Sequence, residues 1–145
     1  MRRVGVALLA AGTMLLSGCA NERSDPPADP IAAARALPDA AGSVRTGEAS
    51  CGEFVLDQGE EIPAEAVDCL ASAEGVAEIA WSTPTTEGDP IVSFAQVAPW
   101  QPGVYLYRTT AFDDFGGDGY SWTMFSCTDR RDLGAAGECE QLFEG

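Results

Sequence analysis

Five carboxylates in two turn-like segments are the side chains of this sequence best suited to bind a ligand. They fall in residues 85–90 and in the glycine-rich residues 113–119, and they are Glu87, Asp89, Asp113, Asp114 and Asp118. Carboxylate oxygens accept strong hydrogen bonds from cationic groups such as guanidinium. Gly88 and Pro90 are also common turn residues, so turn formation alone is the competing interpretation of the first segment. These five residues form the candidate contact site.

Carboxylates in loops have two other uses. An EF-type calcium loop needs acidic residues at alternate positions and a later bidentate glutamate. Phe115 occupies the alternate position after Asp113, and no glutamate follows before Glu138. A carboxylate pair could also hydrolyse a glycoside, although a small domain leaves little room for a deep cleft. No metal site is assigned, and a calcium-dependent surface domain and a carboxylate-based envelope hydrolase remain the alternatives to a binding domain.

Histidine and lysine are absent from the whole chain. The commonest general base and transition-metal ligand is therefore missing, and so are Schiff-base and P-loop chemistry. The serines have no histidine or lysine to activate them as nucleophiles. The sequence thus predicts a non-enzymatic protein that uses no cofactor.

The chain is strongly acidic, with a formal net charge of -15. From Cys51 onward, eighteen acidic residues face three arginines. Such a surface repels nucleic acid and anionic lipid headgroups, so nucleic-acid binding is disfavoured. A cationic protein partner or a divalent metal is compatible with this charge, but acidity identifies neither, and solubility in an extracytoplasmic space is the favoured explanation.

Four cysteines follow residue 50, and they are Cys51, Cys69, Cys127 and Cys139. An even number in a small exported domain indicates two disulfides, for which four cysteines allow three pairings. The pairs Cys51–Cys69 and Cys127–Cys139 are favoured because they close short loops, but the sequence alone does not choose among the pairings. A zinc site needs cysteines two to four residues apart, and this spacing is absent.

The N-terminus carries a targeting pattern. Arg2 and Arg3 precede an uncharged apolar run over residues 4–16, which is too short to span a bilayer. The following Leu16-Ser17-Gly18-Cys19 resembles the bacterial lipobox. This resemblance implies that residues 1–18 are a lipoprotein signal peptide and that Cys19 is acylated. The mature chain would then be anchored to the cell membrane through the lipid on Cys19, on the extracytoplasmic side.

Composition divides the mature chain into a tether and a domain. Residues 19–50 are rich in alanine, proline, aspartate, serine and glycine and hold no aromatic residue. Residues 31–37 are alanine-rich but too short to persist as a helix alone. We expect a lipidated cysteine with a disordered tether over residues 19–50, and a small disulfide-stabilised α+β domain over residues 51–145.

Hydrophobic periodicity predicts the elements of this domain. A helix is expected to begin at Pro63 and to end near Ala73, and the tail after residue 128 to be irregular apart from Cys139. Strands are expected over residues 54–56, 77–82, 91–98, 104–110 and 120–128. Short connections between consecutive strands imply antiparallel neighbours. The predicted fold is α+β, with one helix packed on a four- or five-stranded antiparallel β-meander and two disulfides.

The meander brings the candidate contacts together. Consecutive connections in a meander alternate between the two ends of the sheet, so residues 85–90 and 113–119 should share one end. Trp100, in a proline-bracketed turn, should lie at the other end. The five carboxylates are therefore expected to form one composite site without Trp100.

The segment Thr85-Thr86-Glu87-Gly88-Asp89-Pro90-Ile91, followed by Asp114-Phe115-Gly116 and then Cys127, resembles a family of small bacterial lipoproteins. The family has a domain of unknown function with a T-x-E-G-D-P-I signature ahead of a strand and a D-x-F-G loop further on. The likeness covers residues 51–127. It implies a small exported domain and assigns no activity.

Overall fold

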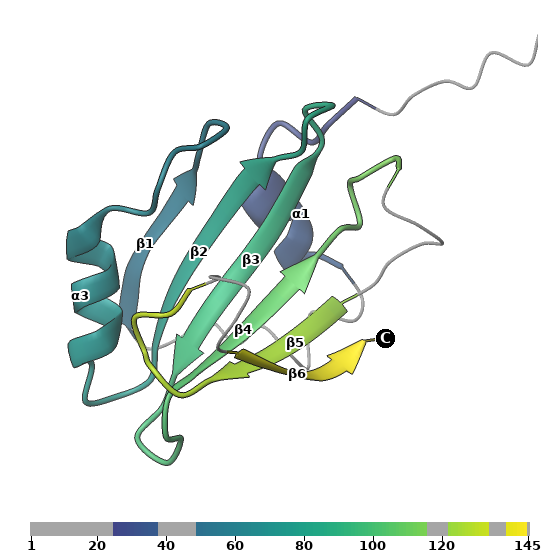
Figure 1. Cartoon of the computed structure of the whole chain (residues 1–145). Coiled ribbons are helices and arrows are strands. Elements are labelled where there is room, and N and C mark those ends of the chain that lie inside the picture. The colour runs from purple at the N-terminus through teal and green to yellow at the C-terminus, as the bar shows by residue number, and fades with distance from the viewer. Residues whose placement is uncertain (1–24, 38–48, 116–121, 134–138, 145) are drawn as a thin grey trace, which may run out of the picture.

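A computed structural model describes residues 25–37, 49–115, 122–133 and 139–144 of this chain. In this part, six strands form a single sheet in the order β1-β2-β3-β4-β5-β6, together with two short helices (Figure 1). The helices are α1, Pro30–Arg35, and α3, Ala64–Ser72. The strands are β1 Ala49–Val55, β2 Ala77–Pro84, β3 Pro90–Val97, β4 Val104–Thr109, β5 Trp122–Cys127 and β6 Cys139–Glu144.

The predicted fold class is wrong, because the structure is mostly β and its sheet is mixed. The first strand, β1, pairs with β2 in parallel, and only the pairs from β2 to β6 are antiparallel. The helix α3 connects β1 to β2. A helical crossover carries the chain back to the end of the sheet where the first strand began, so the two strands must run the same way.

The tail expected to be irregular forms the sixth strand. Residues Cys139–Glu144 make β6, which pairs with β5 in antiparallel fashion and places Cys139 opposite Cys127. Its sequence is rich in glutamate and lacks a clear hydrophobic alternation, and such a strand is held by its neighbour's hydrogen bonds more than by its own apolar face. The strand pattern of residues 139–144 was therefore too weak for β6 to be predicted from the sequence.

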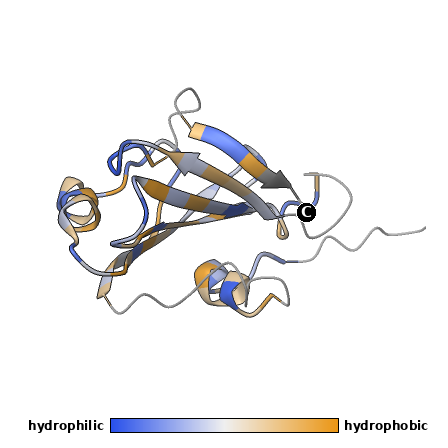
Figure 2. Ribbon diagram, turned by 90° about the horizontal axis from the view of Figure 1, so that it is seen from below, coloured by the Kyte–Doolittle hydropathy of each residue, from blue (hydrophilic) through white to orange (hydrophobic). Residues whose placement is uncertain are grey.

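Two apolar cores lie on opposite faces of the sheet. Alternate residues of a strand point to opposite faces, and β2 divides accordingly, with Ile79 and Trp81 in one core and Ala80 in the other. On the first face, α3 contributes Ala66 and Leu70 to the core. Helix α1 lies on the second face (Figure 2). The central strands are therefore buried on both sides.

Helix α1 lies within the segment expected to be a disordered tether, and the structure corrects that expectation for residues 25–37. The carboxylate of Asp29 caps the helix by accepting from the backbone N–H of Ala32 at 2.9 Å. Ile31 is 2% exposed and Ala34 is fully buried against the sheet. A six-residue helix is unstable alone, so packing of this apolar face provides the missing stability.

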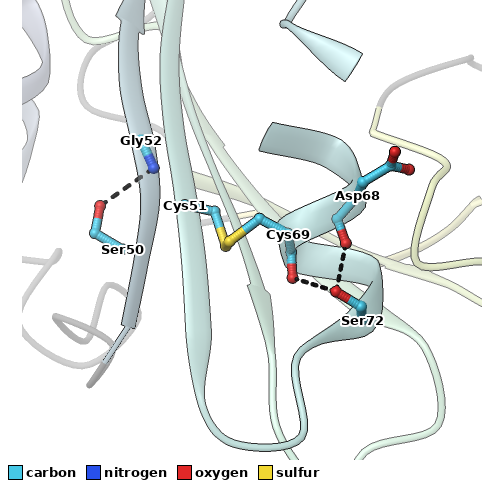
Figure 3. Close-up of a disulfide and its surroundings, with 6 residues drawn as sticks. All are labelled: Ser50, Cys51, Gly52, Asp68, Cys69 and Ser72. Atoms are coloured by element: carbon cyan, nitrogen blue, oxygen red, sulfur yellow. Dashed lines mark hydrogen bonds between the residues drawn. A yellow bond between two sulfur atoms is a disulfide. The ribbon is translucent and has the colours of Figure 1, made fainter. Parts of the chain in front are cut away.

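The structure contains two disulfides, as predicted, and they join Cys51 to Cys69 and Cys127 to Cys139. The first links the edge strand β1 to α3 (Figure 3). The second links the adjacent strands β5 and β6. Both bridges therefore fasten an outer strand, where an open sheet has fewest neighbours.

Candidate binding site

The two acidic segments are joined by a hydrogen bond between them. The Oδ2 atom of Asp89, in the β2–β3 connection, accepts from the backbone N–H of Asp114 at 3.3 Å. Thr85 closes the turn before Asp89, because its backbone N–H donates to the Asp89 carbonyl at 2.8 Å and its hydroxyl accepts from the Asp89 N–H at 3.1 Å. The structure thus brings residues 85–89 and 113–115 to one end of the sheet.

The predicted contact residues differ in how accessible they are at this end. Glu87 and Asp114 are exposed, whereas Asp89 is only 2% exposed and acts as a support between the two segments. The Oδ1 atom of Asp113 accepts from the backbone N–H of Phe115 at 2.9 Å, which shapes the loop. Asp118 lies outside the described residues, as does the lipidation candidate Cys19. Of the four predicted carboxylates within the described residues, Glu87 and Asp114 are therefore the exposed ones.

An exposed aromatic residue stands beside these carboxylates. Phe115 directly follows Asp114, and 70% of its surface is exposed. In the sequence analysis Phe115 marked a break in the spacing of calcium ligands and a position of the D-x-F-G loop. An aromatic residue among turn formers is also a signal of a contact surface, and this signal was missed. Aromatic side chains are enriched at interfaces because they bury a large apolar area with few rotatable bonds. We call Glu87, Asp89, Asp113, Asp114 and Phe115 the acidic end.

The N-terminal segment joins the sheet at the acidic end. Residues 26–28 line an open cavity of about 240 Å³ together with Gly88 of the β2–β3 connection and with Pro84 and Pro90, which end β2 and begin β3. Trp100, which is 73% exposed, lies in the β3–β4 connection at the opposite end of the sheet (Figure 1). The two ends are separated by the length of β3, whose eight residues span about 27 Å.

A charged cluster on the α1 face was missed by the sequence reasoning. Arg35 donates to Glu78 at 2.5 Å and to Glu53 at 2.7 Å, and its guanidinium lies 4.7 Å from the ring centre of Phe94. Gln96 donates to the other oxygen of Glu78 at 2.6 Å. Burial lowers the pKa of Arg35. The hydrogen bonds and charges of Glu78 and Glu53 together raise this pKa by more than burial lowers it, so the net shift is upward. The cluster holds α1 on the sheet.

Two signals in the sequence could have found α1. Asp29 is a good N-cap residue, and Pro30 suits the first position of a helix. Ile31 and Ala34 have the three-residue spacing that places them on one helical face. What the sequence could not show was the buried carboxylate of Glu78 that receives Arg35, because it lies on a strand 43 residues away.

The arginines of the described part are all engaged within the chain. Arg35 pairs with Glu78 and Glu53, and the others are Arg108, bound to the Ser93 hydroxyl, Arg130, bound to the Ala73 carbonyl, and Arg131, paired with Asp68. Burial lowers the pKa of Arg108, which also lies 5.7 Å from the ring centre of Phe125. Each of these four arginine side chains therefore serves a contact within the domain.

The described residues contain neither a metal-binding cluster nor a membrane-spanning helix. No group of three or more histidine, cysteine, aspartate or glutamate side chains there is arranged to hold a metal ion. Neither of the two helices in this part is long and apolar enough to cross a membrane.

Comparison of the chain with protein-family models, with curated proteins and with solved structures gives no match. The fold and the site themselves define a small, mostly β domain that is fastened by two disulfides and carries exposed carboxylates at one end.

Proposed function

We propose that this protein is a lipid-anchored extracytoplasmic binding protein, without enzymatic activity or cofactor, whose acidic end binds a cationic protein partner. The observation that carries the proposal is the hydrogen bond from the Asp114 N–H to Asp89. It unites two acidic segments and leaves Glu87, Asp114 and Phe115 exposed together. Carboxylates beside an exposed aromatic ring suit a partner that offers arginine and an apolar side chain.

Several features support the location. The lipobox-like Leu16-Ser17-Gly18-Cys19 follows an apolar run of signal-peptide length. Disulfides persist in oxidising compartments outside the cytoplasm, and this chain has two of them. The resemblance of residues 51–127 to a family of small bacterial lipoproteins agrees with the same location. Cys19 is the proposed lipidation site and residues 1–18 the proposed signal peptide.

The binding proposal is tested with the full mature chain and a labelled arginine-rich peptide. Replacing Glu87→Gln and Asp114→Asn together should weaken binding about tenfold, because each exposed ion pair contributes up to about 1 kcal/mol. The affinity of the native chain should also fall as ionic strength rises, since exposed charges are screened by salt.

A control variant separates the acidic end from general charge. Glu61→Gln with Glu65→Gln removes the same number of exposed charges near α3, away from the acidic end. This variant should bind the peptide almost as well as the native chain. An equal loss of affinity in both double variants would contradict the proposal, because the partner would then respond to net charge alone.

A further inference from the structure

We propose that the acidic end faces the membrane and that its partner is a basic juxtamembrane segment of an integral membrane protein. This inference rests on the proposed lipid anchor at Cys19 and deepens the proposed function by naming the place and shape of the partner. Three observations carry it: where the chain joins the sheet, how firmly α1 is docked, and what charge the acidic end presents.

The first observation is the short distance along the chain between the proposed anchor and the sheet. Cys19 precedes Asp25 by six residues, which span about 20 Å when fully extended. Residues 26–28 then line the same open cavity as Pro84, at the end of β2, and Gly88, which follows Glu87 in the β2–β3 connection. However the domain tilts, the acidic end stays within a few tens of ångströms of the lipid headgroups.

The second observation is that α1 cannot act as part of a long tether while it is docked. Ile31 and Ala34 are buried against the sheet, and Arg35 is paired with Glu78 and Glu53. If this segment were free, the thirty residues from Cys19 to Ala49 could extend about 100 Å from the membrane. Docking of α1 therefore leaves only the residues before Asp25 between the proposed anchor and the folded domain.

The third observation concerns what fits beneath the domain. A folded domain of about 100 residues has a radius of gyration of about 13 Å and is too wide for a gap of about 20 Å. A single helix is about 10 Å wide and fits. Anionic headgroups do not attract the exposed carboxylates of Glu87 and Asp114. A basic segment that lies on the membrane is attracted both to the anionic headgroups and to the acidic end. This charge defines the chemistry of the partner.

The orientation is tested on lipidated protein in nanodiscs that contain a spin-labelled headgroup lipid. Amide signals of Glu87 and Asp114 should be broadened most, whereas those of Trp100 and Gly103, at the far end of β3, should keep most of their intensity. Equal broadening at both ends, or stronger broadening at Trp100, would overturn the orientation. Coupling a lipid chemically to Cys19 keeps this test independent of whether cells acylate the residue.

The partner class is tested with two probes. One is an arginine-rich segment placed directly after a membrane-spanning peptide, and the other is the same segment in an exposed loop of a soluble folded carrier. On nanodiscs the native chain should bind the first probe at least tenfold more tightly than the second. A long glycine-serine spacer inserted between Ser24 and Asp25 should remove this preference, because it lifts the domain away from the headgroups.

A measurement in solution distinguishes failure of this inference from failure of the proposed function. The Cys19→Ser chain, which has no anchor, should bind the carrier probe in solution. If it does not, the acidic end is no arginine-binding surface and the proposed function fails. If it does, but the anchored native chain binds both probes equally well, the membrane-facing inference alone is overturned.

Discussion

Arg35 of α1 donates a 2.5 Å hydrogen bond to Glu78 of β2, although 43 residues separate them in the chain. The Glu78 side chain is only 5% exposed, so this carboxylate is nearly out of water and depends on its cation. The pair fastens the N-terminal segment to the sheet and thereby sets where the chain leaves the domain.

Replacement of Arg35 should be costly. Arg35→Met leaves the carboxylate of Glu78 buried without its cation, and removal of one partner of a buried pair costs about 3 kcal/mol in the free energy of unfolding. Denaturant unfolding with intact disulfides measures this loss. Arg131→Met is the matched control, since Arg131 and Asp68 are 58% and 62% exposed and exposed ion pairs contribute little to stability. Equal losses of stability in the two variants would show that the buried carboxylate of Glu78 does not depend on Arg35.

The apolar contact of α1 should matter as well. Ile31→Ala removes a side chain that is 2% exposed and should lower the free energy of unfolding by about 2–4 kcal/mol. Val55→Ala, at a position that is 69% exposed, should change it by less than about 0.5 kcal/mol. Hydrogen exchange of the α1 amides reports the same difference locally. Rapid exchange of these amides in the native chain would mean that α1 is not docked.

The two disulfides should contribute almost equally to stability. In the chain-entropy model, closing a loop of this size stabilises a domain by about 3 kcal/mol. The sequence separations of 18 and 12 residues differ by only about 0.4 kcal/mol in that model. We therefore expect similar losses for the double alanine variants at Cys51 with Cys69 and at Cys127 with Cys139. A difference of several kcal/mol would show that one bridge acts mainly through packing.

Gly103 should tolerate no side chain. Its φ is +111°, and a Cβ atom there would fall on the carbonyl oxygen of Cys127, a backbone atom that cannot move aside. Gly103→Ala should therefore destabilise the domain by more than about 2 kcal/mol. Gly88→Ala, with φ of +92° but open space around it, should cost about 1 kcal/mol. Thermal unfolding of both variants checks this order, and its reversal would contradict the geometry of the Gly103 turn.

Substitutions of Asp89 and Glu87 should have different effects, the first on stability and the second on peptide binding. Asp89→Ala removes a buried acceptor for the Asp114 N–H and should cost about 1–3 kcal/mol, with faster hydrogen exchange at Asp114. Glu87→Ala, on the exposed side of the same turn, should leave stability within about 0.5 kcal/mol and weaken only peptide binding. If Glu87→Ala destabilised the domain as much as Asp89→Ala, the division of roles would be wrong.

The local elements of the middle of the chain could be predicted because their signals are local. The helix expected from Pro63 to Ala73 is α3, Ala64–Ser72, and the strand expected over residues 77–82 lies within β2. Even so, Glu78 and Ser82 are polar residues of this strand, and both are buried. An alternating strand shows which residues share a face but not whether a distant segment covers the other face.

The sequence by itself determined the composition, the number of cysteines and the concentration of negative charge, since these properties do not depend on how the chain is folded. Only the tertiary structure decided that β1 runs parallel to β2, that α1 covers the second face, and that Asp89 is a buried support while Glu87 stays exposed. Each of these outcomes depends on contacts between residues far apart in the chain, such as Arg35 with Glu78 and Asp89 with Asp114. A local sequence pattern does not show such contacts, so only the folded chain decides which carboxylates support the structure and which stay exposed.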